Sequence, residues 1–167
     1  MPYFNIVAQT SENTVVTEYD PVRARSDSYQ SEAELEQEFI RMLCEQGYEY
    51  LPIHTEADLI ANLRRKLEAL NRHQFTDSEW DRFFKDSLAN PNEHIVEKTR
   101  KIQEDHVQVL KRDDGTTKNI TLINKKNIHS NLLQVINQYA VSRDEGAKHD
   151  NRYDVTILVN GFPMIHV

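Results

Sequence analysis

The sequence predicts a single mixed α/β (α+β) domain, in which helices pack on a sheet. The first half of the chain repeatedly shows helix-start signals followed by apolar residues at helical spacing. The second half instead alternates apolar and polar residues with a period of two, which is typical of strands. With 167 residues, the chain is long enough to bury a substantial core.

The first predicted helix begins at a capping box. The hydroxyl of Ser31 and the carboxylate of Glu34 can each satisfy a free backbone N–H at the start of a helix. Apolar residues continue at helical spacing until about Gln46, and Gly47 is placed to end the helix in the left-handed conformation. These signals predict a helix over residues 32–46.

Three more helices are predicted before residue 104. Thr55 caps the second helix, and Thr76 with Glu79 forms another capping box that opens the third. Asn90-Pro91 ends the third helix, because the residue before a proline avoids the helical conformation. The fourth helix is predicted over residues 93–103.

Five strands are predicted in the rest of the chain. The turn Asp113-Asp114-Gly115 joins the first two into a hairpin, and Asn160-Gly161 joins the last two. The predicted strands are 106–111, 118–123, 131–141, 152–160 and 162–167. For residues 5–30 the sequence predicts only a short strand or ordered arm, followed by a loop.

Composition excludes several classes of protein. The single Cys44 excludes an internal disulfide and a cysteine-based metal site. No apolar run reaches the length of a membrane-spanning helix, and the first residues lack the layout of a signal peptide. A cytoplasmic protein without a membrane partner is therefore expected. The four glycines form no nucleotide-cradling loop, so no residue is predicted to bind an organic cofactor.

The charge of the chain is unevenly distributed. The formal net charge is −7, yet residues 98–126 carry eight basic and four acidic side chains. A basic segment on an acidic chain is compatible with contact to phosphate groups. A solvated helix and hairpin with no ligand is the simpler interpretation of the same charges.

Asp154 is the candidate for chemistry. It lies at the start of a predicted strand, where a carboxylate is held rigidly and can serve as a metal ligand. A structural role as a cap or salt-bridge partner is equally compatible with this position. The seven histidines are scattered and none has the spacing of a zinc site.

The last predicted hairpin contains the segment Arg152-Tyr153-Asp154-Val155-Thr156-Ile157-Leu158-Val159-Asn160-Gly161-Phe162-Pro163. This segment resembles the nuclease-domain motif of the R (restriction) subunit of type I restriction-modification enzymes. These subunits carry an N-terminal RecB-like PD-(D/E)xK endonuclease domain. Three further segments resemble that family, namely residues 13–19, 34–48 and 131–141. The resemblance covers nearly the whole chain and is least distinctive over residues 72–128.

This resemblance implies a restriction-endonuclease-like fold, with a mixed sheet packed by helices. Residues 31–47 and 131–167 would form the core and residues 55–123 a helical and hairpin insertion. The whole of 1–167 would be a partial endonuclease domain that is truncated before the end of the core. The motor and assembly domains of the full subunit would be absent from it.

The resemblance also implies site residues. Asp154 matches the family's catalytic, metal-binding Asp, and Glu36 falls near the catalytic acid of the first core helix. The Glu-x-Lys motif of the family would begin with the first residue after Val167, so the fragment alone is expected to be inactive. A complete site would bind Mg²⁺, and ATP would bind only to the full-length subunit.

The partners implied are double-stranded DNA and, through the full-length chain, the methyltransferase and specificity subunits of the restriction complex. The full enzyme would cut DNA after ATP-driven translocation.

Two alternative functions remain open at this point. One is a non-catalytic DNA-binding or assembly module, and the other is a different PD-(D/E)xK nuclease, such as a repair exonuclease.

The register of the last hairpin decides what Asp154 faces. A simple two-residue turn at Asn160-Gly161 would place Asp154 opposite Val167. Pro163 cannot donate to a ladder and favours a wider or bulged loop. In the wider loop Leu158 pairs with Met164, and Asp154 lies opposite the first residue after Val167.

Overall fold

The computed structural model describes residues 3–9, 15–20, 31–141 and 151–167, with side chains for 31–138 and 154–167. It divides into two compact units, Met1–Leu35 and Glu36–Val167. In the first unit, strands β1 (Tyr3–Gln9) and β2 (Val15–Asp20) form an antiparallel hairpin. The sequence predicted one strand or arm here. Two strands form because each satisfies the backbone hydrogen-bonding groups of the other.

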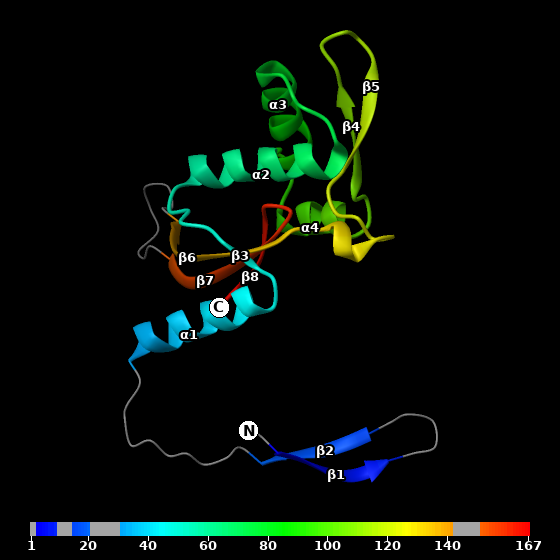
Figure 1. The fold of residues 1–167 in the computed structure, drawn as a ribbon. Helices are drawn as coiled ribbons and strands as arrows, with labels where there is room; N and C mark the ends of the chain where they lie inside the picture. The colour runs from blue at the N-terminus through cyan, green and yellow to red at the C-terminus, as the bar shows by residue number, and fades with distance from the viewer. Residues whose placement is uncertain (1–2, 10–14, 21–30, 142–150) are drawn as a thin grey trace. The chain divides into compact units, whose positions relative to one another are not determined.

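The second unit contains a four-stranded mixed sheet in the order β3-β6-β7-β8 (Figure 1). Its strands are β3 (Glu49–Tyr50), β6 (Leu133–Val141), β7 (Asn151–Val159) and β8 (Phe162–His166). Strand β3 runs parallel to β6, while the other neighbours are antiparallel. The predicted mixed α/β fold is therefore confirmed. Strand β3 was missed, because two residues are too few to show a period.

Helices cover both faces of this sheet. Helix α1 (Glu32–Glu45) places Leu43 in a buried cluster with Val155, which defines the α1 face. Helix α2 (Glu56–Asn71) places Leu59 against a cluster that contains Ile136 and Leu158, which defines the α2 face. Because side chains alternate along a strand, the odd-numbered residues of β7 between 154 and 159 face α1 and the even-numbered ones face α2.

A second core joins α2 to the middle of the chain. Helix α3 (Asp77–Phe83) continues into a π-helical turn, η1 (Phe84–Leu88), and α4 (Ile95–Gln103) follows. Strands β4 (Val107–Lys111) and β5 (Thr117–Thr121) form the predicted hairpin, and a short 3₁₀ helix, η2 (Ile128–Ser130), leads to β6. The buried residues of this core are Leu63, Leu67, Phe75, Trp80, Phe83, Leu110, Ile120, Leu122 and Phe162.

The turn between β7 and β8 is anchored to the second core and to the residue that precedes β6. Asn160 and Gly161 have φ angles of 52° and 87°, as a type I′ turn requires. The fully buried Asn160 side chain accepts a hydrogen bond from Leu132 N at 2.8 Å and donates one to Leu122 O at 3.0 Å. A Cβ on Gly161 would lie 2.7 Å from the Cα of Leu63. The hairpin that carries Asp154 is therefore held firmly at its tip.

Candidate active site

Asp154 lies on β7 with an exposed side chain. The alternation of β7 places it on the α2 face together with the buried Thr156 and Leu158. Asp154 is exposed beside the buried Val155 and Thr156, so its carboxylate is both rigidly held and accessible to a ligand.

The register between β7 and β8 contains a bulge. Val159 pairs with Phe162 and Leu158 with Pro163, after which the register shifts. Beyond the shift, Val155 and Val167 exchange two backbone hydrogen bonds of 2.8 and 3.3 Å. A bulged hairpin was predicted and is confirmed. The pairing of Leu158 with Met164 was wrong, because the two-residue turn is kept and Met164 is the extra residue of the bulge.

This register has a direct consequence for Asp154. With Val155 paired to Val167, a residue that continued β8 after Val167 in the same register would lie opposite Asp154. Residues directly opposite each other in an antiparallel pair share a sheet face. A side chain at that position would therefore lie on the α2 face beside the carboxylate of Asp154.

Strand β6, which pairs with β7, is distorted at the position opposite Asp154. The pairs Asn137–Val155 and Tyr139–Tyr153 flank the position where Gln138 lies opposite Asp154. Gln138 has a φ of 53°, in the left-handed region that a non-glycine residue rarely adopts. Such conformations cost about 1–3 kcal/mol and concentrate at functional sites. The sequence carried no signal for this distortion.

One further polar pair lies on the α2 face beside Asp154. Thr156 and His166 are directly opposite each other in the β7–β8 ladder. The Thr156 hydroxyl and the Nδ1 of His166 are hydrogen-bonded at 2.9 Å. In the sequence His166 is only one of several scattered histidines, because its partner is ten positions away in the chain.

Glu36 lies on the other side of the sheet. Its carboxylate accepts a hydrogen bond of 2.6 Å from the Nδ2 of Asn137, whose Oδ1 accepts one of 2.9 Å from the Tyr50 hydroxyl. Asn137 pairs with Val155 and so belongs to the α1 face. The structure therefore brings Glu36 to Asn137 and Tyr50 but does not bring it to the face of Asp154. Neither partner was predicted from the sequence.

A pair of buried amide side chains joins helix α2 to the α2 face of the sheet. Asn62 of α2 donates to the Oε1 of Gln134 at 3.0 Å, and Gln134 donates back at 3.3 Å. Gln134 also donates to Glu49, which pairs with Lys66 at 2.7 Å. The hydrogen bond from Lys66, assisted by that from Gln134, holds the pKa of Glu49 below its ordinary value. This network ties α2 to the sheet edge.

Metal-ligating side chains are not clustered in the described part of the chain. Within the described ranges, no three His, Cys, Asp or Glu side chains are grouped to hold a metal ion. Asp154 is therefore not part of such a group among these residues. In the same ranges, no helix is long and apolar enough to cross a membrane.

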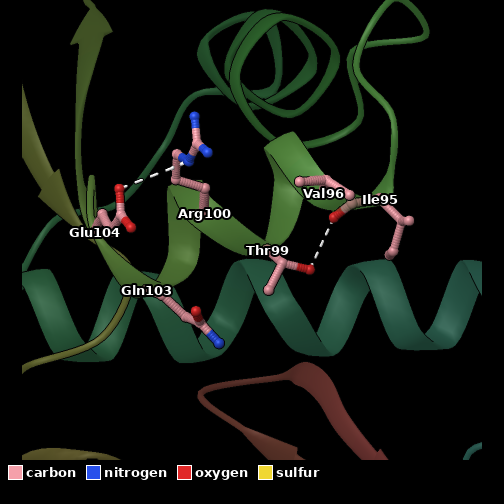
Figure 2. A pocket seen from close by; sticks show the side chains of 6 residues that line it. All are labelled: Ile95, Val96, Thr99, Arg100, Gln103 and Glu104. Atoms are coloured by element: carbon pink, nitrogen blue, oxygen red, sulfur yellow. Dashed lines mark hydrogen bonds and ion pairs between the residues drawn. The ribbon is translucent and has the colours of Figure 1, made fainter.

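The basic segment 98–126 is partly neutralised. Lys101 pairs with Glu93 at 2.6 Å, and Arg112 pairs with Asp114 at 3.0 Å. Its helix α4 also lines a surface hollow of about 330 Å³ (Figure 2). The hollow is bordered by Ile95, Val96, Thr99, Arg100, Gln103 and Glu104. This lining includes a single acid and excludes Asp154, so the hollow offers no alternative centre for metal chemistry.

Comparison with known proteins gives a consistent family. Residues 29–167 match the family model described as the type I restriction enzyme R protein N terminus. The chain is 41% identical over 162 residues to the type I restriction enzyme EcoprrI endonuclease subunit of Escherichia coli. It is 35% identical over 144 residues to the SsaAORF53P endonuclease subunit of Staphylococcus saprophyticus. It is 32% identical over 145 residues to the SauMSSORF170P endonuclease subunit of Staphylococcus aureus.

These matches cover most of the chain but only part of each relative. They include 96%, 83% and 84% of this chain, respectively. They include 50% of the Escherichia coli subunit and 14% and 15% of the two staphylococcal subunits. The similarity therefore describes a region of these subunits.

Proposed function

Because the chain belongs to the family of type I restriction enzyme R protein N termini, we propose that it is the nuclease domain of such a subunit. Its reaction would be Mg²⁺-dependent hydrolysis of phosphodiester bonds in double-stranded DNA. The observation that supports this proposal is the bulged β7–β8 register, in which a residue continuing β8 after Val167 would lie opposite Asp154. In the type I restriction family that the sequence resembles, the Glu of the Glu-x-Lys motif would occupy this position.

The residues present fit one part of a magnesium site. Mg²⁺ is usually held by one or two carboxylates, together with waters and phosphate oxygens. Asp154 is exposed, so it leaves room for waters and for a phosphate group. When bound, Mg²⁺ would polarise the phosphate and lower the pKa of an attacking water. Asp154 would hold the ion, and β7 would fix the direction of its carboxylate.

Glu36 fits a positioning role better than that of a metal ligand. Its carboxylate is directed to Asn137 on the α1 face. Asn137 is adjacent in sequence to Gln138, whose left-handed backbone lies opposite Asp154. Glu36 would thus stabilise the part of β6 that borders the metal site. Its effect on the reaction would pass through the backbone of β6.

In the intact subunit, this domain would act with ATP-driven motor domains and with the methyltransferase and specificity subunits. Translocation would deliver DNA to the nuclease domain, and no fixed sequence would be needed at the cut. The two activities would then be separable. Loss of the metal site would stop cleavage and leave ATP hydrolysis intact.

The test is Asp154→Ala in the intact subunit, assembled with its partner subunits. Plasmid cleavage should fall roughly 100-fold or more, equivalent to about 3 kcal/mol or more of barrier. ATP hydrolysis and translocation should keep their normal rates. Asp81→Ala, which removes an exposed acid of α3, is the matched control and should cut normally.

Near-normal cleavage by Asp154→Ala would contradict the metal site. Absence of cleavage by the unmodified assembled enzyme, with DNA binding retained, would instead support a non-catalytic DNA-binding or assembly module. Metal-dependent cleavage that needs no ATP would support a nuclease of another kind, such as a repair exonuclease.

A further inference from the structure

The hydrogen-bonded pair Thr156–His166 joins a buried side chain to an exposed one. Thr156 is 1% exposed, whereas His166 on the edge strand β8 is exposed. A buried hydroxyl needs a partner, and the Nδ1 of His166 is within 2.9 Å. The buried threonine therefore holds the ring of an exposed histidine in one orientation.

The pair lies one step along the sheet from Asp154. Thr156 is two residues after Asp154 on the same strand and the same face, and His166 is opposite Thr156. Diagonal neighbours across an antiparallel ladder are separated by roughly 7–8 Å. A metal ion on a carboxylate lies about 2 Å from its oxygen. A phosphate group that contacts such an ion at Asp154 would then be within reach of the imidazole.

We infer that His166, oriented by Thr156, is a substrate-contacting residue of the nuclease centre that hydrogen-bonds a non-bridging oxygen of the DNA backbone. This inference rests on the proposed function of Asp154. An imidazole N–H is a suitable donor to a phosphate oxygen, and hydrogen bonds to ionised acceptors are among the stronger ones. The contact would align the phosphodiester with the metal ion, because the ring and the carboxylate share one rigid strand pair.

The experiment uses the intact subunit with its partner subunits and compares His166→Ala, His166→Gln and Thr156→Val. His166→Ala should slow plasmid cleavage about 10–100-fold, as loss of a supporting contact at a metal site commonly does. His166→Gln should recover part of the rate, because its amide can also donate to phosphate. Thr156→Val keeps the side-chain volume and removes the anchor, so its rate should fall between those of the unmodified enzyme and His166→Ala.

Three further measurements separate this role from others. The Mg²⁺ concentration for half-maximal cleavage should stay unchanged in all three variants, since His166 is not the ligand. ATP hydrolysis should also stay unchanged in all three variants. The thermal unfolding midpoint should stay unchanged in Thr156→Val, which leaves no buried hydroxyl without its partner. His129→Ala, an exposed histidine of η2, is the matched control and should cut normally.

Normal cleavage by His166→Ala would overturn the inference. Equal cleavage rates for His166→Gln and His166→Ala, together with a lower unfolding midpoint of Thr156→Val, would overturn it too, because the pair would then be structural. A shifted Mg²⁺ requirement would also overturn it, by making His166 part of the ion's environment. None of these results would change the outcome of the Asp154→Ala test, so the proposed function is tested separately.

Discussion

Val155 and Val167 are joined by two backbone hydrogen bonds, with N···O distances of 2.8 and 3.3 Å. This pair lies beyond the bulge at Met164, which adds one residue to β8 relative to β7. Without the bulge, Asp154 would be opposite Val167, and the next residue would point to the other sheet face. A single extra residue therefore decides which position of the chain shares a sheet face with Asp154 directly opposite it.

Glu36→Ala should reduce DNA cleavage by the intact subunit about 10-fold or more, because Asn137 loses the acceptor at 2.6 Å. Glu36→Gln should restore most of the rate, since its Oε1 can still accept that hydrogen bond. Cleavage rates at several Mg²⁺ concentrations provide the measurement. If Gln behaves like Ala and both variants need more Mg²⁺, Glu36 is a ligand and the positioning role is wrong. Gln37→Ala, on the exposed side of α1, is the control.

Gly161→Ala should destabilise the domain by about 2–4 kcal/mol. The new Cβ would meet the Cα of Leu63 at 2.7 Å, and the φ of 87° is unfavourable for alanine. Gly115→Ala is the matched control, because its φ is 81° but no atom lies within 4 Å. It should cost about 1–2 kcal/mol, from the backbone conformation alone. Chemical denaturation of the three proteins measures the difference. Equal losses would show that the turn does not press on α2.

Asn62→Ala should destabilise the domain by about 1–3 kcal/mol, because it leaves the buried amide of Gln134 without one of its partners. Gln134→Ala should have a similar effect. The double variant should lose less than the sum of the two single losses, since the same reciprocal pair is broken in each. Urea denaturation of all four proteins completes this cycle. Strict additivity would indicate that the two amides act independently.

Asp113 should make the folding stability of the domain depend on pH in the acid range. Its carboxylate accepts hydrogen bonds from Ser78, Thr76 and Arg82, in decreasing order of effect, and these hold its pKa far below the ordinary value. A carboxylate with a lowered pKa stabilises the fold above its unfolded pKa of about 4. That stabilisation is lost as the pH falls toward the folded pKa.

Asp113→Asn should therefore be less stable than the unmodified protein at neutral pH. The difference should stay constant down to about pH 5 and should shrink below about pH 4. Denaturation midpoints measured across this range provide the check. A difference that does not change with pH would mean that the cluster acts through packing and not through the charge of Asp113.

Local chemistry along the chain determines where most of the helices and strands lie. The capping residues Ser31, Thr55 and Thr76 mark the starts of α1, α2 and α3. They do so because a side-chain oxygen satisfies a backbone N–H within the same turn. The period-two segments likewise identified β6, β7 and β8. Asp154 could be singled out because its motif is continuous in sequence.

The tertiary structure decided the relationships between residues that are distant in the chain. The sequence did not show that Glu36 contacts Asn137, that Asn137 contacts Tyr50, or that Thr156 contacts His166. Strand pairing and helix packing bring these pairs together across ten to about one hundred positions of the chain. The sequence predicted a wider or bulged last hairpin but not that Met164 would be the extra residue, and it did not predict the left-handed Gln138. Backbone conformations of this kind depend on neighbouring strands. The sequence by itself thus determined which carboxylate is the candidate ligand. Long-range pairing decided which sheet face that carboxylate occupies and which side chains lie beside it.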